Sequence, residues 1–186
     1  MNALIVLGSR NPQGQTARTA GALASGLEQA GAVVERVFLT ELSIERCRQC
    51  DARGWGDCRE KGVCVIDDDM AGLAGRMRAA DRIAFATPVY FSDLSESMRA
   101  YLDRLRRIMR HQDGRDGLAG KPALGICVAG GGGGGAPACA LSLEKILTTA
   151  GLNVVDMIPV RRQNLEHKLD VLRLTGAWFA GPHPAE

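Results

Sequence analysis

The stretch ALIVLGSRNPQGQT, residues 3–16, decides the fold of this chain. Residues 3–7 are all apolar, and a short unbroken apolar run predicts a strand that is buried on both faces. A polar loop with two glycines follows, and residues 16–30 then carry alanines and leucines at helical spacing. We therefore expect a buried strand, a loop and a helix, with Thr16 as the residue that caps the helix.

The same alternation of strand and helix continues along the chain. Further apolar runs predict strands at residues 33–39, 82–86, 123–129 and 152–160. Amphipathic spacing predicts helices at residues 70–80, 92–109, 138–150 and 164–180. Three aspartates at 67–69 would cap the helix at 70–80. This order predicts an α/β fold: a doubly wound, five-stranded parallel sheet of order 2-1-3-4-5 in a three-layer α/β/α sandwich.

Composition favours one soluble domain that covers residues 1–186. Hydrophobic residues make up 46% and charged residues 24% of the sequence, as in ordinary globular proteins. The net charge of +2 is too small to favour nucleic acid as a partner. No signal peptide and no membrane-spanning run is visible, so we expect a cytoplasmic protein with no membrane partner. One irregular part interrupts the alternation, a cysteine-rich excursion at about residues 44–66.

Ligands of doubly wound sheets bind at the carboxyl ends of the strands, so the loops after the first, third and fourth strands are the candidates for chemistry. The first loop, residues 8–16, offers backbone N–H groups at a helix start together with hydroxyl, amide and cationic side chains. These groups suit a phosphate, although an ordinary capped turn would look the same. The loop lacks the lysine of a P-loop and the spacing of a dinucleotide fingerprint, which disfavours ATP and a Rossmann-type NAD site.

The other two loops contain an aromatic pair and a run of glycines. Tyr90 and Phe91 lie between a buried strand and an amphipathic helix, where they would either line a flat ring or plug the top of the core. Residues 130–135 are all glycine, which allows close backbone approach to a ligand, although polyglycine is more often a flexible surface loop. The position of this run at the end of a strand favours contact with a ligand.

Together these loops resemble those of the NADPH-dependent FMN reductase and multimeric flavodoxin group, which includes the iron–sulfur flavoproteins. GS at 8–9 and GQT at 14–16 match the phosphate loop of the group, with glutamine in place of asparagine. PVYF at 88–91 matches its second loop, with Ser92 in place of the usual glycine. The resemblance is good over residues 1–109, which also contain the similar motifs CVI at 64–66, DDM at 68–70 and YLDR at 101–104. It is looser over the glycine loop and the last strand.

The resemblance implies a flavodoxin-like fold that binds FMN and uses NAD(P)H as co-substrate. The FMN phosphate would lie against Ser9, Arg10, Gln13, Gln15 and Thr16. The isoalloxazine ring would pack along Pro88, Val89, Tyr90, Phe91 and Ser92. Its pyrimidine edge would face Ala129, Gly130, Gly131 and Gly132. Because related proteins form dimers and tetramers, a homo-dimer or homo-tetramer is expected.

Four of the six cysteines lie in the excursion, with the spacing C-x2-C-x7-C-x5-C: Cys47, Cys50, Cys58 and Cys64. We favour a [4Fe–4S] cluster bound by four thiolates, ahead of free thiols, a four-cysteine zinc site and a disulfide switch. Iron–sulfur flavoproteins resemble this arrangement, but they have a shorter spacing between the second and third cysteines. Cys127 and Cys139 stand apart, and we expect them in the core.

Three functions remain open at this point. The first is an FMN-dependent enzyme that passes electrons from NAD(P)H to a quinone, a flavin or another small acceptor; no side chain is assigned as catalytic, because the cofactor does the chemistry. The second is an iron–sulfur flavoprotein that carries electrons between larger redox partners. The third is a flavin-loaded assembly or regulatory module. Arg161 and Arg162 could meet the phosphate of a nicotinamide nucleotide, but we favour a solvated face for this pair.

Overall fold

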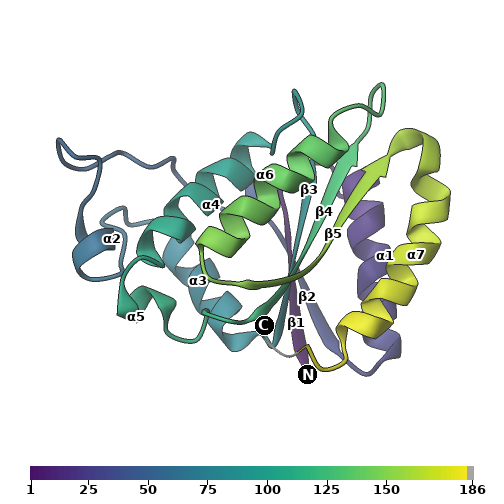
Figure 1. The fold of residues 1–186 in the computed structure, drawn as a ribbon, viewed down its shortest axis with the longest axis horizontal. Coiled ribbons are helices and arrows are strands. Elements are labelled where there is room, and N and C mark those ends of the chain that lie inside the picture. Colours follow the sequence, from purple (N-terminus) through teal and green to yellow (C-terminus); the bar gives the residue numbers. More distant parts are fainter. Residues whose placement is uncertain (184–186) are drawn as a thin grey trace.

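The computed structural model describes residues 1–183 and confirms the predicted sheet (Figure 1). All strand pairs are parallel, and the order is β2-β1-β3-β4-β5. The strands are β1 (Asn2–Leu7), β2 (Val33–Phe38), β3 (Arg82–Pro88), β4 (Pro122–Ala129) and β5 (Asn153–Arg161). The three central strands are buried along nearly their whole length, which explains why each is a continuous apolar run in the sequence.

Helices cover both faces of the sheet and complete the three predicted layers (Figure 1). One face carries α1 (Gln15–Gln29) and α7 (Leu165–Phe179), and the other carries α3 (Met70–Ala79), α4 (Glu96–Ile108) and α6 (Ala136–Thr149). Each face has its own hydrophobic cluster, because alternate residues of every strand point to opposite sides. The sequence did not predict four short elements: η1 (Leu39–Glu41), α2 (Asp57–Glu60), α5 (Gln112–Arg115) and η2 (Arg162–Asn164).

The starts of α1, α4 and α6 differ from the predicted ones. Thr16 does not cap α1; the capping position is occupied by Gly14, and Thr16 is buried in the first turn of the helix. The helix expected at 92–109 begins later because Ser95 caps it, with its Oγ accepting a hydrogen bond from the N–H of Met98 at 3.4 Å. The residues before that cap form a tight turn instead, closed by a bridge between Tyr90 and Asp93.

The aspartates at 67–69 also act differently from the prediction. Asp69 stands at the capping position of α3, but its carboxylate accepts a hydrogen bond from the N–H of Ser43 at 2.7 Å. Asp68 accepts one from the N–H of Met70 at 3.1 Å. The acidic run therefore joins the start of α3 to the excursion, in addition to serving the helix.

The excursion lies beside α3 and α4, outside the sheet (Figure 1). It leaves after η1, contains α2, and returns to the fold at the start of α3. Within residues 1–183, no helix is both long enough and apolar enough to cross a membrane.

Candidate functional site

The loops after β1, β3 and β4 meet at the carboxyl edge of the sheet, as predicted. The Oγ of Ser97, in the first turn of α4, donates to the carbonyl of Gly8 at 3.2 Å. The N–H of Val89 donates to the carbonyl of Val128 at 2.9 Å. These bonds place the first loop beside the start of α4, which follows the second loop, and place the second loop beside the end of β4.

The first loop is shaped by side chains that bond to their own backbone. The buried Ser9 accepts a hydrogen bond from the N–H of Asn11 at 3.3 Å, and Asn11 accepts one from the N–H of Gln13 at 2.9 Å. Such turns bring successive N–H groups toward the helix start. Arg10 is exposed at the surface of this loop.

The start of α1 has features of an anion site. No side chain caps the helix, and no acidic residue lies in its first turn. Its free N–H groups and the helix dipole therefore favour a negatively charged ligand. The Oε1 atom of Gln15 is buried and has no hydrogen-bond partner within residues 1–183, and rotation of this amide would present two N–H donors at the same place. A Cβ atom added to Gly130 would lie 3.6 Å from that oxygen, which brings the third loop against the first.

The second loop is strained and exposes its aromatic residues. Phe91 and Ser92 have φ angles of +49° and +65°, in the left-handed region that favours glycine. Such residues cost about 1–3 kcal/mol each and are concentrated at functional sites. Phe91 is fully exposed and Tyr90 is 48% exposed, so the alternative that they plug the top of the core is wrong.

The glycine loop is held at two points. The carbonyl of Gly132 accepts a hydrogen bond from Nε2 of Gln163, in η2, at 3.0 Å. Gly135 has a φ of +80° and caps α6, and a Cβ atom added to it would lie 2.8 Å from Cα of Ser92. Because Gly135 caps the helix, α6 begins at Ala136, two residues before the predicted start. The third loop is thus attached to the second loop and to the end of β5.

A second candidate region lies in the excursion, where the cysteines gather. One small cavity of about 20 Å³ is lined by all four predicted cysteines, Cys47, Cys50, Cys58 and Cys64. All of them are free thiols. Burial raises the pKa of the Cys58 thiol, against smaller opposing effects from the N–H of Gly56 and the charge of Arg107.

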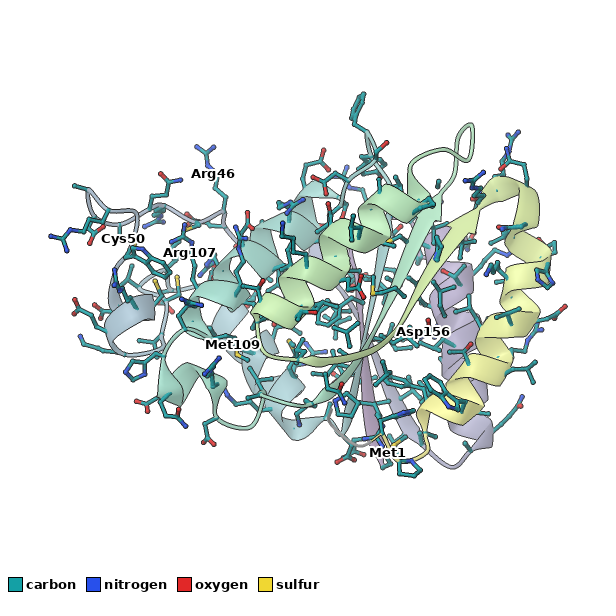
Figure 2. The ribbon with its side chains drawn as sticks, viewed as in Figure 1. Met1, Arg46, Cys50, Arg107, Met109 and Asp156 are labelled. Carbon is teal, nitrogen blue, oxygen red and sulfur yellow. The ribbon has the colours of Figure 1, made fainter. Side chains whose placement is uncertain are left out.

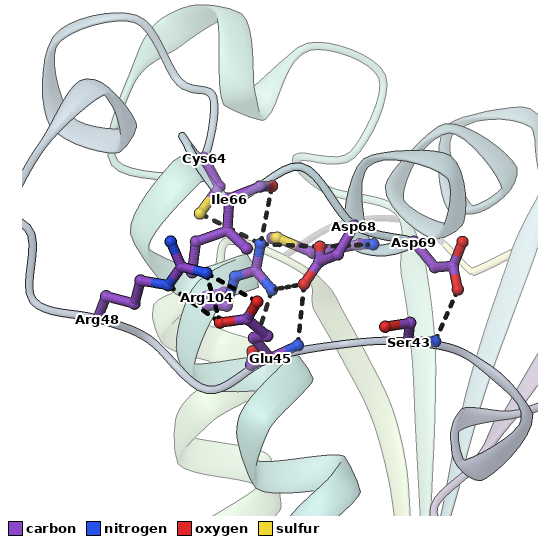
Figure 3. A network of polar contacts seen from close by, with 9 residues as sticks. Ser43, Glu45, Arg48, Cys64, Ile66, Asp68, Asp69 and Arg104 are labelled. Carbon is purple, nitrogen blue, oxygen red and sulfur yellow. Dashed lines mark hydrogen bonds and ion pairs between the residues drawn. The ribbon is translucent and has the colours of Figure 1, made fainter.

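A buried ion pair holds this region together (Figure 3). Arg104 of α4 is 1% exposed, and it donates to both carboxylate oxygens of Asp68 at 2.5 and 3.0 Å. The same guanidinium donates to the carbonyl of Glu45 at 3.0 Å and to Sγ of Cys64 at 3.3 Å. The N–H of Glu45 in turn donates to Asp68 at 2.9 Å. Both ends of the excursion are therefore bonded to one side chain of α4.

The pKa of Asp68 reflects this network. Burial alone would raise the pKa of the carboxyl group, but hydrogen bonds from Arg104 and from two backbone N–H groups outweigh burial and lower it. Asp68 is consequently ionised wherever the protein is folded near neutral pH, and the pair is a charged one.

Thiols are suitable ligands for a metal centre, but these four are not arranged around a common metal position. Four cysteines are the usual ligands of an iron–sulfur cluster or of structural zinc. However, no three His, Cys, Asp or Glu side chains of residues 1–183 converge closely enough to hold a metal ion. The cavity has room for about one water molecule. A cluster would therefore require the excursion to open around it.

The remaining predicted residues lie where they were expected. Cys127 and Cys139 are fully buried in the core, and the hydrogen bond that the Cys127 thiol donates to Cys139, together with burial, raises the pKa of Cys127. Arg161 and Arg162 are exposed. Arg104 was missed, although its spacing from Tyr101 and Leu105 places it on the apolar face of α4; a charged residue on that face was the available signal.

The sheet order, the uncapped helix start and the loops at this edge define a flavodoxin-like protein. The chain belongs to the NADPH-dependent FMN reductase family, whose model matches residues 1–166.

Curated relatives and a solved structure are similar to this chain. An iron–sulfur flavoprotein of Archaeoglobus fulgidus is 32% identical over 105 residues, which cover 56% of this chain and 46% of the relative. One of Methanosarcina thermophila is 36% identical over 84 residues, 45% of this chain and 41% of the relative. The chain thus matches less than half the length of these two relatives. An NAD(P)H:quinone oxidoreductase from Methanothermobacter marburgensis shares the fold, with a TM-score of 0.72, 19% identity and coverage of 100% of this chain and 99% of the other.

Proposed function

We propose that this chain is an NAD(P)H-dependent FMN reductase that delivers electrons to a quinone, a free flavin or another small acceptor. Bound FMN would supply the chemistry, by taking up a hydride from NAD(P)H and releasing two electrons to the acceptor. The observation that carries the proposal is the meeting of three loops at one edge: an uncapped helix start, a strained aromatic turn and a glycine run. Family membership supports it.

The first loop would bind the phosphate of FMN. The free N–H groups at the start of α1 point to this role, and Gln15 would gain the partner that its buried amide lacks. The exposed Arg10 would add positive charge. The other side chains assigned to the phosphate are Ser9, Gln13 and Thr16.

The second and third loops would hold the ring. The left-handed conformation of Ser92 lets the backbone approach a ligand as a glycine would, and Pro88, Val89, Tyr90 and Phe91 complete the turn. Ala129, Gly130, Gly131 and Gly132 carry small side chains or none, so their own side chains would leave room for the pyrimidine edge. No side-chain acid or base is required, because these residues would position the ring and the cofactor would supply the chemistry.

Titration with FMN, followed by the loss of flavin fluorescence, tests the binding. We expect one FMN per chain, and an affinity about tenfold weaker for Gln15→Ala, since one hydrogen bond to a charged group is lost. Gln29→Ala, at the other end of the same helix, is the matched control and should bind FMN like the unaltered chain. Failure of FMN to bind would overturn the proposal.

Anaerobic mixing with NADPH or NADH tests the reaction. We expect the visible absorption of the bound flavin to bleach, and to return when a quinone is added. A flavin that binds but is bleached by neither nucleotide would rule out the reductase and leave the carrier or the regulatory module.

Four cysteines around one cavity favour a second candidate function, an iron–sulfur flavoprotein that carries electrons between larger partners. The curated relatives carry that name. Iron, sulfide and zinc assays on anaerobically purified protein test it: about four irons per chain are expected for a [4Fe–4S] cluster, and Cys58→Ala should remove them. Zinc in place of iron, or no metal, would exclude this candidate.

Assembly is a separate part of the proposal. A homo-dimer or homo-tetramer stays a prediction, and light scattering on the FMN-loaded protein would test it.

A further inference from the structure

A groove of about 650 Å³ opens beside the cysteine cavity, between the excursion and α4. Figure 2 labels one arginine from each of the two segments that line the groove, Arg46 on the excursion and Arg107 on α4. The lining consists of two segments of chain, one from the excursion and one from α4: Arg46, Cys47, Arg48, Gln49, Asp103, Arg106 and Arg107. Four of these seven side chains are arginines.

The positive charge of this groove is only partly neutralised. Arg48 is paired with Glu45 at 2.8 Å, and Arg106 with Asp103 at 2.9 Å. Within residues 1–183, Arg46 and Arg107 form no ion pair with a carboxylate. After these two pairings the groove keeps the positive charges of Arg46 and Arg107, so a charge equal to the net +2 of the whole chain is gathered in one hollow.

A second hollow extends the same surface. It has a volume of about 290 Å³, shares two arginines with the groove and adds Arg110, Trp55 and Thr149. Guanidinium groups stay charged at every working pH, and like charges held close together repel each other. An anion in the groove would relieve that repulsion.

One of the arginines is fixed in position. Arg107 donates to the carbonyl of Gly54 at 2.6 Å, and its guanidinium lies 5.0 Å from the centre of the Trp55 ring. A guanidinium held in this way loses little freedom when it binds a ligand.

We propose that this groove binds a small molecule that carries a diphosphate group. Arginine is the side chain best suited to bidentate bonds with phosphate oxygens. The groove has a volume typical of small-molecule sites and is hollowed between two segments, which fits a small ligand better than the surface of a protein. It lies at the excursion, apart from the three flavin loops, so the proposal does not rest on the FMN reductase activity.

Calorimetric titration with inorganic pyrophosphate at low salt, using protein saturated with FMN, tests the proposal. FMN keeps the probe out of the first loop. We expect one site per chain, with an affinity that falls about tenfold in Arg46→Ala and again in Arg106→Ala, because each removes a charge-assisted hydrogen bond. Added salt should weaken binding. Arg173→Ala, on α7 at the opposite face, is the control and should leave the affinity unchanged.

Two results with pyrophosphate would overturn the proposal. It fails if pyrophosphate does not bind, or if the Arg46→Ala, Arg106→Ala double variant binds it as tightly as the Arg173→Ala control. Binding of poly-glutamate but not of pyrophosphate would also overturn it, in favour of an acidic protein. If the chain takes up no FMN, the same comparison of variants decides the question, because Arg46 and Arg106 lie outside the flavin loops.

Discussion

The carboxyl edge of the sheet and the cysteine excursion are held in place by different means. At the edge, the loops also meet through close backbone contacts: Gly135 packs against Ser92, and the N–H of Gly8 continues the strand ladder by bonding to Ala86 at 2.8 Å. In the excursion, one buried side chain, Arg104, bonds to both ends of the segment. The edge therefore depends in part on glycines that let two loops touch, and the excursion depends on one charged side chain.

This difference predicts where each region is vulnerable. A region held by close backbone contact fails when a methyl group is added, whereas a region held by an ion pair fails when a charge is removed. The following changes are designed to separate the two cases.

Arg104→Ala should have the largest effect. It leaves the carboxylate of Asp68 buried without its partner, and loss of one member of a buried pair costs about 3–5 kcal/mol of unfolding free energy. Urea denaturation measures this loss, and limited proteolysis should show that residues 44–66 become sensitive first. Arg106→Ala removes a partly exposed pair on the same helix and should cost about 1 kcal/mol or less. Equal losses in the two variants would contradict the role given to Arg104.

Gly135→Ala should have an intermediate effect, on the other region. The added Cβ meets the backbone of Ser92, and the φ of +80° is unfavourable for alanine. We expect a loss of about 1–3 kcal/mol in stability, together with weaker FMN binding. Gly134→Ala is the control, because no atom of residues 1–183 lies within 4 Å of a Cβ added there. If both variants have the same stability and FMN affinity, the contact between these loops is unimportant.

Ser92→Gly should have a smaller effect, with the opposite sign. Glycine relieves the strain of the left-handed conformation, and part of that gain is lost to the greater freedom of the unfolded chain. We expect about 0.5–1 kcal/mol of added stability by thermal denaturation. Ser92→Ala keeps the strain and should show no gain. A stabilised alanine variant would indicate that the hydroxyl group, and not the φ angle, is unfavourable.

Acidification from neutral pH should change the unfolding free energy least of all these perturbations. The folded-state pKa of Asp68 is lowered from 3.8, so the stability that this carboxylate contributes is fully present above that value and is lost as pH falls through the lower, folded pKa. The unfolding free energy of Asp68→Asn should therefore depend less steeply on acid pH than that of the unaltered chain. Asp67→Asn, at an exposed neighbour, should keep the original slope.

The sequence predicted the sheet, and the meeting of three loops at its carboxyl edge, well for a physical reason. Central parallel strands are buried on both faces, so each appears as an unbroken apolar run such as residues 3–7. Once the order of strands is known, the loops at their carboxyl ends must share one edge. Helix starts were predicted less well, because Gly14 and Ser95 set them through local backbone geometry.

The excursion was the part that the sequence could not resolve. The cysteine spacing predicted a thiol-rich site, and the four side chains do line one cavity. How they are held depends on Arg104 and Asp68, which lie 36 positions apart in the chain. Hydrophobic periodicity does not predict a contact between residues so far apart in the sequence. The arginine groove is likewise built from two distant segments, and the modest net charge of the chain conceals it.

The excursion also closes on itself. The N–H of Ser43 donates to the carboxylate of Asp69 at 2.7 Å, and the N–H of Asp69 donates to the carbonyl of Ser43 at 3.1 Å. The segment between Ser43 and Asp69 is therefore an insertion whose two ends are bonded to each other, outside the sheet. Each doubling of such a segment costs only about 0.6 kcal/mol in closure entropy. The number of residues between cysteines can therefore drift through evolution, or be redesigned in the laboratory, while the carboxyl edge of the sheet keeps its shape.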